Sequence, residues 1–248
     1  MPWLTRLATV ARRTGFPVVE VAGWRTRGHG PQPSVEGVVC HHTAGRDDMH
    51  IVRDGRPGLD GPLSQFWLRR DGTIFVVAAG RCWHNAPSTS PHHTNSASLG
   101  IEAENNGREA WPVRQLEAYR RLCAELCREY SLPASRVKAH REVNTGKPDP
   151  HSIDMGDFRA DVAQLLAGRA PALPARLPEL RPGATSEHVV TLRKALGAAN
   201  QTSTVYDPTD PDLLALVEQF KTAHKLGVGP VWTAACWAIL NHQEKEKS

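Results

Sequence analysis

Apolar runs and alternations in the first two thirds of the chain predict several strands. Segment 35–41, Val-Glu-Gly-Val-Val-Cys-His, predicts a buried strand, and segment 99–104 alternates apolar and polar residues. Such an alternation is typical of a strand with one face on a core. Segments 63–68 and 73–78 flank an Arg-Asp-Gly turn signal, so they predict a hairpin.

Helical spacing of apolar residues follows between these strands. A helix with Pro112 in its first turn carries an apolar stripe formed by Leu116, Tyr119, Cys123, Leu126, Cys127 and Tyr130. The first dozen residues show the same spacing more briefly, and segment 155–167 predicts a closing helix. Strands and helices mixed in this way predict an α/β fold, with a mixed central β-sheet flanked by helices.

The last third of the chain has a different composition. Segment 167–182 turns to Ala, Pro and Arg, which predicts a semi-rigid linker. Beyond it, apolar residues at helical spacing predict three helices, at 187–199, 211–224 and 233–242. We therefore expect three parts: a main domain at 1–168, a linker at 169–182 and a small all-α module at 183–248.

The charge of the chain limits the classes of partner. The formal net charge is +4, and the apolar fraction of 40% suits a protein with a real core. The surplus lies in 1–170, where 22 basic residues face 18 acidic ones, whereas 171–248 carries eight of each. Because there is no polybasic tail, we expect no nucleic-acid partner. A mildly basic body would be drawn to an anionic polymer.

Cysteine usage and the start of the chain bear on location. The five cysteines are odd in number and scattered, so they form no disulfide framework and favour a reducing compartment. Arginines interrupt the apolar residues of the first segment, and no later run is long enough to span a bilayer. We expect a monomer without a signal peptide that does not insert into membranes.

Two histidine positions and an aspartate carry the strongest chemical signal. His41 ends the strand at 35–41 and His42 follows it, His140 ends a short apolar strand, and Asp149 lies between two prolines. A catalytic zinc site needs three protein ligands and one open position, and two histidines with a carboxylate meet that need. The alternative is a set of scattered surface histidines and an ordinary turn.

Only one histidine of the pair can easily face a given cleft, because strand side chains alternate between the two faces. Val39 and His41 share one face, whereas Val38, Cys40 and His42 share the other. The other histidine would then support the site or pack against it. Periodicity does not choose between them.

Charged residues near this set suit amide chemistry. Glu102 and Glu104 project from the polar face of the strand at 99–104, and a carboxylate near zinc-bound water can take its proton. Lys147 precedes Asp149 by two residues and is placed to meet the negative charge of a tetrahedral intermediate. The alternative reading is solvated carboxylates and a plain surface lysine.

Four motifs follow one another between about Val35 and Phe158. They are Gly-Val-Val-Cys-His-His-Thr-Ala-Gly at 37–45, Trp-His-Asn-Ala at 83–86, the strand at 99–104, and 140–154. Together they resemble the zinc N-acetylmuramoyl-L-alanine amidases, the amidase-2 group related to animal peptidoglycan recognition proteins. Four motifs in the right order are much more specific than any one of them.

The resemblance implies a division of roles within the site. His41, His140 and Asp149 would hold Zn²⁺. Glu102 would be the general base, and Lys147 would stabilise the oxyanion. The bond cut would be the amide between the lactyl group of N-acetylmuramic acid and the L-alanine of the stem peptide.

Other residues are expected around the cleft. His84 would line it, and we place His42 and Glu104 with His84 as substrate-binding residues. Two departures from the family pattern matter. The segment after His140 is about one residue short, which makes His151 a reserve ligand, and Gln65 stands where many relatives carry a histidine.

The last segment resembles three-helix peptidoglycan-binding domains. The matching positions are Leu180-Arg-Pro-Gly-Ala, Val189, Leu192, Leu196, Leu216, Phe220, His224 and 227–232. An apparent insertion covers 201–211, and the usual Asp-Gly pair is missing. Trp232 and Trp237 would either stack on sugars or form a core.

The combination suggests an endolysin, a wall-lytic enzyme that waits in the host cytoplasm until the membrane is breached and then acts on bacterial peptidoglycan. Two alternatives stay open. One is a non-catalytic protein that only binds muropeptides. The other is a zinc peptidase acting on proteins, although its common helical His-Glu-x-x-His signature is missing.

Overall fold

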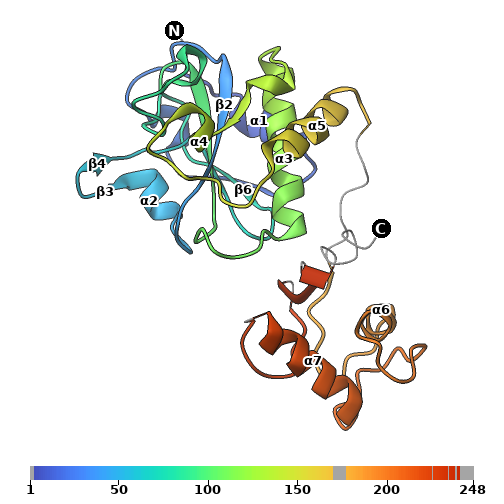
Figure 1. The fold of residues 1–248 in the computed structure, drawn as a ribbon. Helices are drawn as coiled ribbons and strands as arrows, with labels where there is room; N and C mark the ends of the chain where they lie inside the picture. The colour runs from blue at the N-terminus through green and yellow to red at the C-terminus, as the bar shows by residue number, and fades with distance from the viewer. Residues whose placement is uncertain (1–2, 170–176, 225, 234, 238, 241–248) are drawn as a thin grey trace. The chain divides into compact units, whose positions relative to one another are not determined.

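The computed structural model describes residues 3–169, 177–224, 226–233, 235–237 and 239–240. The chain forms two compact units, Met1–Pro174 and Ala175–Ser248, which Figure 1 shows in blue to yellow and in orange to red. Of the predicted linker at 169–182, residues 170–176 lie outside the described part. Among the described residues, no helix is long and apolar enough to cross a membrane.

A mixed six-stranded sheet forms the centre of the first unit, as predicted. Its spatial order is β1 (Val18–Glu20), β6 (Ile74–Val76), β5 (Phe66–Leu68), β7 (Ser98–Ala103), β2 (Gly37–His42) and β8 (Val137–Ala139). Strands β5 and β6 pair antiparallel, which confirms the predicted hairpin, and all other pairs in the sheet are parallel. A separate two-stranded ribbon joins β3 (Gly55–Arg56) to β4 (Leu59–Asp60).

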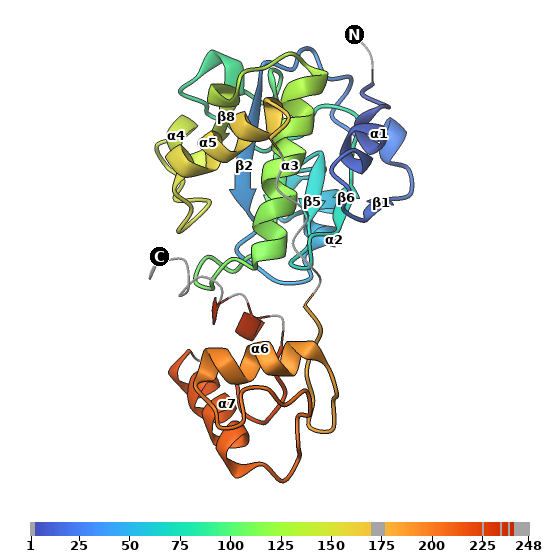
Figure 2. The same cartoon turned by 90° about the vertical axis from the view of Figure 1, so that its right-hand side faces the viewer.

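Three helices cover one face of this sheet (Figure 2). They are α1 (Leu7–Arg12), α3 (Val113–Glu129) and α5 (Met155–Leu166). The predicted apolar stripe of α3 lies in the main core, where Tyr119, Cys123 and Cys127 are fully buried. The cysteines therefore fill the core as small apolar side chains.

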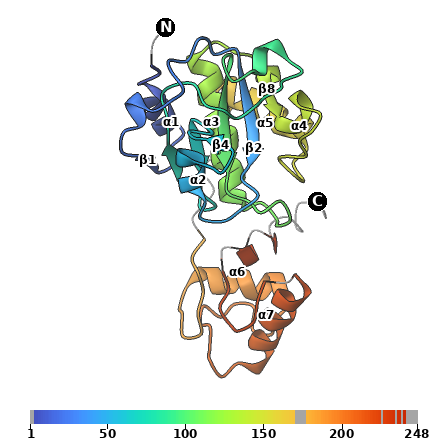
Figure 3. The same ribbon diagram turned by 90° about the vertical axis from the view of Figure 1, so that its left-hand side faces the viewer.

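The opposite face of the sheet is covered more sparsely, by α2 (Met49–Asp54) and by loops (Figure 3). Val52 of α2 packs there on Trp67 and Val77 in a small separate cluster. Short helical turns complete the unit: α4 (His140–Val143) and the 3₁₀ turns η1 (Trp24–Thr26), η2 (Pro91–His93) and η3 (Ala134–Arg136). The less covered face is therefore the one with room for a cleft.

The second unit contains α6 (Glu187–Leu196) and α7 (Pro211–Ala223). Helix α6 ends three residues earlier than predicted, because Gly197 adopts a left-handed conformation (φ 68°) that stops the helix. Of the third predicted helix at 233–242, residues 235–237 and 239–240 are helical, and 241–242 lie outside the described residues. Two isolated bridges, Leu180↔Trp232 and Thr185↔Val205, join its loops.

Both tryptophans of the second unit belong to its core. The exposed fraction is 0% for Trp232 and 2% for Trp237, and the two rings contact each other at 5.6 Å. The Trp237 indole also donates to Pro178 O at 2.9 Å. Rings buried in this way cannot serve as stacking platforms for sugars, so of the two predicted uses the structure shows the core.

Candidate metal centre

His41 is held by the pairing of β2 with β7 and by helix α3. In the parallel register of the two strands, His41 lies opposite Glu102. The Tyr119 hydroxyl of α3 donates to the carbonyls of His41 (2.9 Å) and Ile101 (3.0 Å), one on each strand. Val38 and Cys40 point to the α3 side of the sheet. His41 therefore points to the opposite, less covered face.

His140 enters the site from the end of β8. The sequence predicted that it would be the last residue of that strand, but the strand ends at Ala139 and His140 begins α4. The reason is local: the Glu142 carboxylate accepts a hydrogen bond from Ala139 N at 2.7 Å. That bond satisfies a free N–H at the start of the helical turn.

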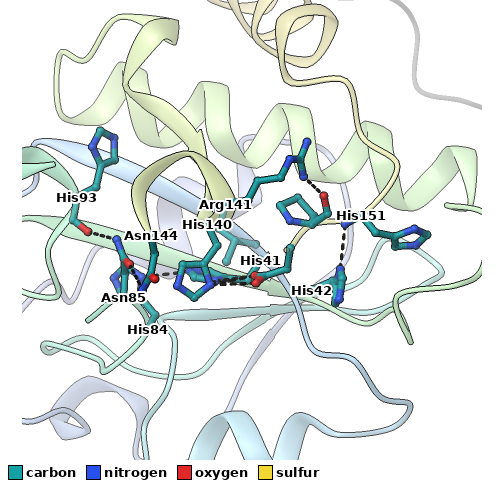
Figure 4. A network of polar contacts seen from close by, with 12 residues as sticks. His41, His42, His84, Asn85, His93, His140, Arg141, Asn144 and His151 are labelled. Atoms are coloured by element: carbon teal, nitrogen blue, oxygen red, sulfur yellow. Dashed lines mark hydrogen bonds and ion pairs between the residues drawn. The ribbon is translucent and has the colours of Figure 1, made fainter. Parts of the chain in front are cut away.

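Asp149 is placed by a loop that Arg141 holds closed. The Arg141 backbone N donates to Asp149 O at 3.0 Å. Its guanidinium donates to the carbonyls of Pro150 and Ile153. Arg141 follows His140 directly in the chain, so these bonds hold the loop of Asp149 close to His140 (Figure 4).

The three predicted metal ligands come together at one point. His41 Nδ1 lies 3.0 Å from His140 Nδ1 and 3.2 Å from Asp149 Oδ2, and His140 Nδ1 lies 3.0 Å from the same oxygen. All three side chains are buried. Tetrahedral zinc with bonds near 2.0–2.1 Å separates neighbouring ligand atoms by about 3.3 Å, so the spacing of these atoms fits a zinc ion.

The protonation states of these groups also fit a cation. Burial lowers the pKa of His41 to about 4, in spite of the nearby Asp149 carboxylate. Burial raises the pKa of Asp149, but hydrogen bonds with His140 and His41 outweigh it, and the net direction is down. At neutral pH the site therefore offers a neutral His41 imidazole and a carboxylate, the forms that bind metal.

Glu102 provides an unpaired carboxylate beside the three ligands. Its Oε2 atom is buried and has no hydrogen-bond partner among the described residues. Burial raises the pKa of Glu102 well above its usual value, and the negative charges of Asp149 and Asp48 raise it further. An unsatisfied acceptor of this kind normally indicates a functional group or a bound molecule.

A cleft opens over these residues. A cavity of about 400 Å³ is lined by His42, His84, Glu102, His140, Lys147 and Asp149, among others. A second cavity of about 300 Å³ shares His84, His140 and Lys147 with it. Lys147 is exposed and lines both cavities, and its ammonium makes no hydrogen bond or ion pair within the described part of the chain. It is free to contact a molecule in the cleft.

His42 and His151 stand apart from the ligand cluster. His42 Nδ1 accepts from His151 N at 3.1 Å (Figure 4), and burial lowers the pKa of His42. His151 Nε2 lies 3.1 Å from both Asn105 Oδ1 and Glu109 O. The structure thus brings His41 rather than His42, and Asp149 rather than His151, into the cluster. His42 lines the larger cavity instead.

Glu104 lies elsewhere than we expected. Its two carboxylate oxygens accept from the backbone N of Asp47 and of Arg70, each at 3.2 Å. It does not belong to the lining of either cavity at the site. Because β7 ends at Ala103, Glu104 lies beyond the strand and holds two loops together instead of facing substrate.

Gln65 also has a structural role. It is fully buried, and its side chain donates to Gly80 O at 3.0 Å and accepts from Gly100 N at 2.8 Å.

Sequence reasoning missed Asn95, whose Oδ1 accepts from the backbone N of His84 and Asn85. The Trp-His-Asn-Ala motif was a signal for this loop, but nothing in it pointed to a partner ten residues away.

Two imidazoles and a carboxylate that could hold a metal ion lie beside a separate unpaired carboxylate, a set of side chains that suits metal-assisted hydrolysis. The sequence family Amidase_2, described as N-acetylmuramoyl-L-alanine amidase, matches residues 31–152. This segment of the chain is therefore similar to that family. The matched segment contains the three ligand candidates together with Glu102 and Lys147.

Several solved structures resemble part of this chain. The "Endolysine N-acetylmuramoyl-L-alanine amidase LysCS" of Clostridium intestinale URNW is 25% identical, with 58% of this chain and 94% of that chain covered (TM-score 0.42). A selenomethionine derivative of AmpD is 21% identical, with 59% and 93% covered (TM-score 0.48). Drosophila PGRP-LB is 19% identical, with 59% and 92% covered (TM-score 0.43). No curated protein matches the sequence significantly.

Proposed function

We propose that the protein is a zinc-dependent N-acetylmuramoyl-L-alanine amidase. Its substrate would be the amide bond between the lactyl group of N-acetylmuramic acid and the L-alanine of the stem peptide in bacterial peptidoglycan. One observation carries the proposal. Within the segment that matches the amidase family, His41, His140 and Asp149 converge, and His140 and Asp149 line one cavity together with the unpaired Glu102 carboxylate.

The proposed mechanism assigns one task to each side chain. His41, His140 and Asp149 would hold Zn²⁺, which would supply Lewis-acid chemistry for the amide carbonyl and the attacking water. Glu102 accepts a proton from the attacking water as the new C–O bond forms, and delivers it to the leaving amine nitrogen as the C–N bond breaks. The Lys147 ammonium donates a hydrogen bond to the oxygen that gains negative charge.

The non-catalytic alternative is less well supported by the same residues. A buried carboxylate oxygen without a partner destabilises the folded protein by about 1–3 kcal/mol. A protein that only binds muropeptides gains nothing from that cost at Glu102. The family match also argues against a peptidase that acts on other proteins.

We further propose that the protein acts as an endolysin, as a monomer, with the second unit binding the cell wall. The pairing of an amidase domain with a separate compact unit supports this, together with the resemblance of that unit's sequence to peptidoglycan-binding domains. In this proposal the enzyme is held in the host cytoplasm until lysis and then reaches the wall.

A product assay on purified peptidoglycan tests the activity. The full chain is incubated with sacculi, with and without a chelator, and both new alanine amino groups and new reducing sugar ends are measured. We expect amino groups that appear only when metal is present. Reducing ends without amino groups would indicate a glycosidase, and no product with retained binding would indicate a pure binder.

A further inference from the structure

His84 makes a contact that the proposed reaction does not use. Its Nδ1 lies 3.2 Å from His41 Nε2, the ring nitrogen that points away from the ligand cluster. The two rings meet edge to face, with centroids 5.3 Å apart and planes at 82°. Figure 4 shows His84 beside His41 and His140. A second histidine therefore lies directly behind a candidate ligand.

The other nitrogen of His84 determines where the protons lie. His84 Nε2 is 3.3 Å from Ser98 O and 3.4 Å from Ser98 Oγ. The carbonyl can only accept, and the Ser98 hydroxyl already donates to Thr94 O at 2.8 Å. Nε2 must therefore carry the proton. A neutral imidazole has only one N–H, so Nδ1 of His84 is an acceptor.

The proton of His41 follows from this arrangement. Since His84 Nδ1 can only accept, His41 Nε2 carries the hydrogen that joins the two rings. His41 Nδ1 then has a free lone pair, and this is the atom that faces His140 and Asp149. We propose that His84 is a positioning residue, which holds His41 in the tautomer whose Nδ1 is free to bind a metal. This inference rests on the proposed zinc site.

The surrounding chain is shaped to hold His84 in this place. A Cβ atom at Gly100 would lie 2.8 Å from His84 Cγ, so only glycine leaves room for the ring. Asn95 Oδ1 accepts from the backbone N of both His84 (2.9 Å) and Asn85 (2.7 Å). Asn144 Nδ2 donates to Asn85 Oδ1 at 3.3 Å (Figure 4), which links this loop to the segment that follows α4.

Substrate contact is the competing role for His84, since its side chain lines both cavities. Both of its ring nitrogens, however, are engaged with other protein groups. It has no polar atom left to donate to a sugar or a peptide. Partners that orient a ligating histidine commonly change metal affinity by 10–100-fold when they are removed.

The test separates the hydrogen bond from the volume of the ring. In His84→Asn, Oδ1 takes the place of Nδ1 as an acceptor, whereas His84→Leu removes the acceptor. Long-range ¹H–¹⁵N spectra of the metal-free full chain report the tautomer of His41. We expect the Nε2–H form in the wild type and in His84→Asn, and a mixture of tautomers in His84→Leu.

Zinc affinity, measured by chelator competition, gives the second readout. We expect the Kd to rise about 10–100-fold in His84→Leu and to stay within a few-fold in His84→Asn. Wild-type tautomer and Kd in His84→Leu would overturn the inference, as would equal losses in both variants. A wild-type chain that binds no zinc contradicts the proposed function instead, and the spectra of metal-free protein then decide on His84 by themselves.

Discussion

Strands β2 and β7 have two faces with opposite chemistry. Towards α3 they present Val38, Cys40, Leu99 and Ile101, all of them apolar and at most 1% exposed. Towards the cleft the same strands present His41, which is also 1% exposed, and Glu102. His41 is as buried as the apolar residues of the other face, whereas Glu102 is only partly buried. Among the described residues, Glu102 Oε2 has no hydrogen-bond partner.

The difference shows how the fold supports an unfavourable site. On the cleft face, Glu102 Oε2 and His140 Nε2 are buried without hydrogen-bond partners, at a cost of about 1–3 kcal/mol each. On the other face, each fully buried aliphatic side chain contributes about 1.5–3 kcal/mol. The apolar face can therefore offset the polar one, and changes on the two faces should affect different properties.

The largest effect is expected from a ligand on the cleft face. His140→Ala removes one of three ligand atoms that lie within 4.8 Å of one another, so we expect loss of both bound zinc and detectable turnover. Metal analysis of the purified chain and the amino-group assay measure the two effects. One zinc ion per chain in this variant would contradict the assignment of the metal centre.

Glu102→Gln should separate chemistry from metal binding. We expect zinc to be retained and kcat to fall by about 10²–10⁴-fold, because an amide cannot accept the proton from water. The Tm should stay equal or rise, since a neutral amide is less costly to bury than a carboxylate.

Glu104→Gln is the matched control for that variant. Its carboxylate accepts from two backbone N–H groups, and an amide NH₂ would face one of them. We expect kcat to be unchanged and stability to fall by about 1–3 kcal/mol, measured by denaturant unfolding. If Glu102→Gln retained full activity and Glu104→Gln lost it, the two assignments would be reversed.

A change on the apolar face should lower stability and leave chemistry intact. Val38→Ala removes two methyl groups from a fully buried position of β2, which we expect to cost about 2–3 kcal/mol. Val228→Ala is the control, because Val228 is 89% exposed and should have no measurable effect. Zinc content and kcat of folded Val38→Ala should match the wild type; a selective loss of zinc would show that the faces are not independent.

The smallest effect on stability should come from a charged side chain that lies on neither face of β2 and β7. Asp71, in the turn between β5 and β6, is more than one third exposed. Burial acts to raise its pKa, but hydrogen bonds from Arg69 and Thr73 lower it from 3.8 to about 2. Because its pKa is lower in the folded state, Asp71 stabilises the folded protein above pH ~4, and this stabilisation is lost as the pH falls towards 2.

After solvent screening this contribution should be below about 1 kcal/mol. The Tm difference between wild type and Asp71→Asn should therefore be small at pH 6 and shrink as pH falls from 5 towards 3. A Tm difference that grew on acidification would contradict the stabilising effect that we assign to the pairing of Asp71 with Arg69.

Much of the fold could be predicted from the sequence because its signals are local. The β5–β6 hairpin follows from a turn between two apolar runs, and the stripe of α3 follows from residues three and four positions apart. The hairpin and the stripe require only residues that are near each other in the chain. The ligand set is different, because His41 and Asp149 are 108 positions apart, and the choice of His41 came from the resemblance to the amidases.

Other decisions belong to the tertiary structure. Period two placed His41 and His42 on opposite faces without saying which face is open, and only the packing of α3 on Val38 and Cys40 decides it. The same period put Glu102 and Glu104 on one face, but β7 ends between them. The contact of His41 with His84 joins residues 43 positions apart. No local propensity encodes such a distance in sequence, because it is set by how the strands and loops pack.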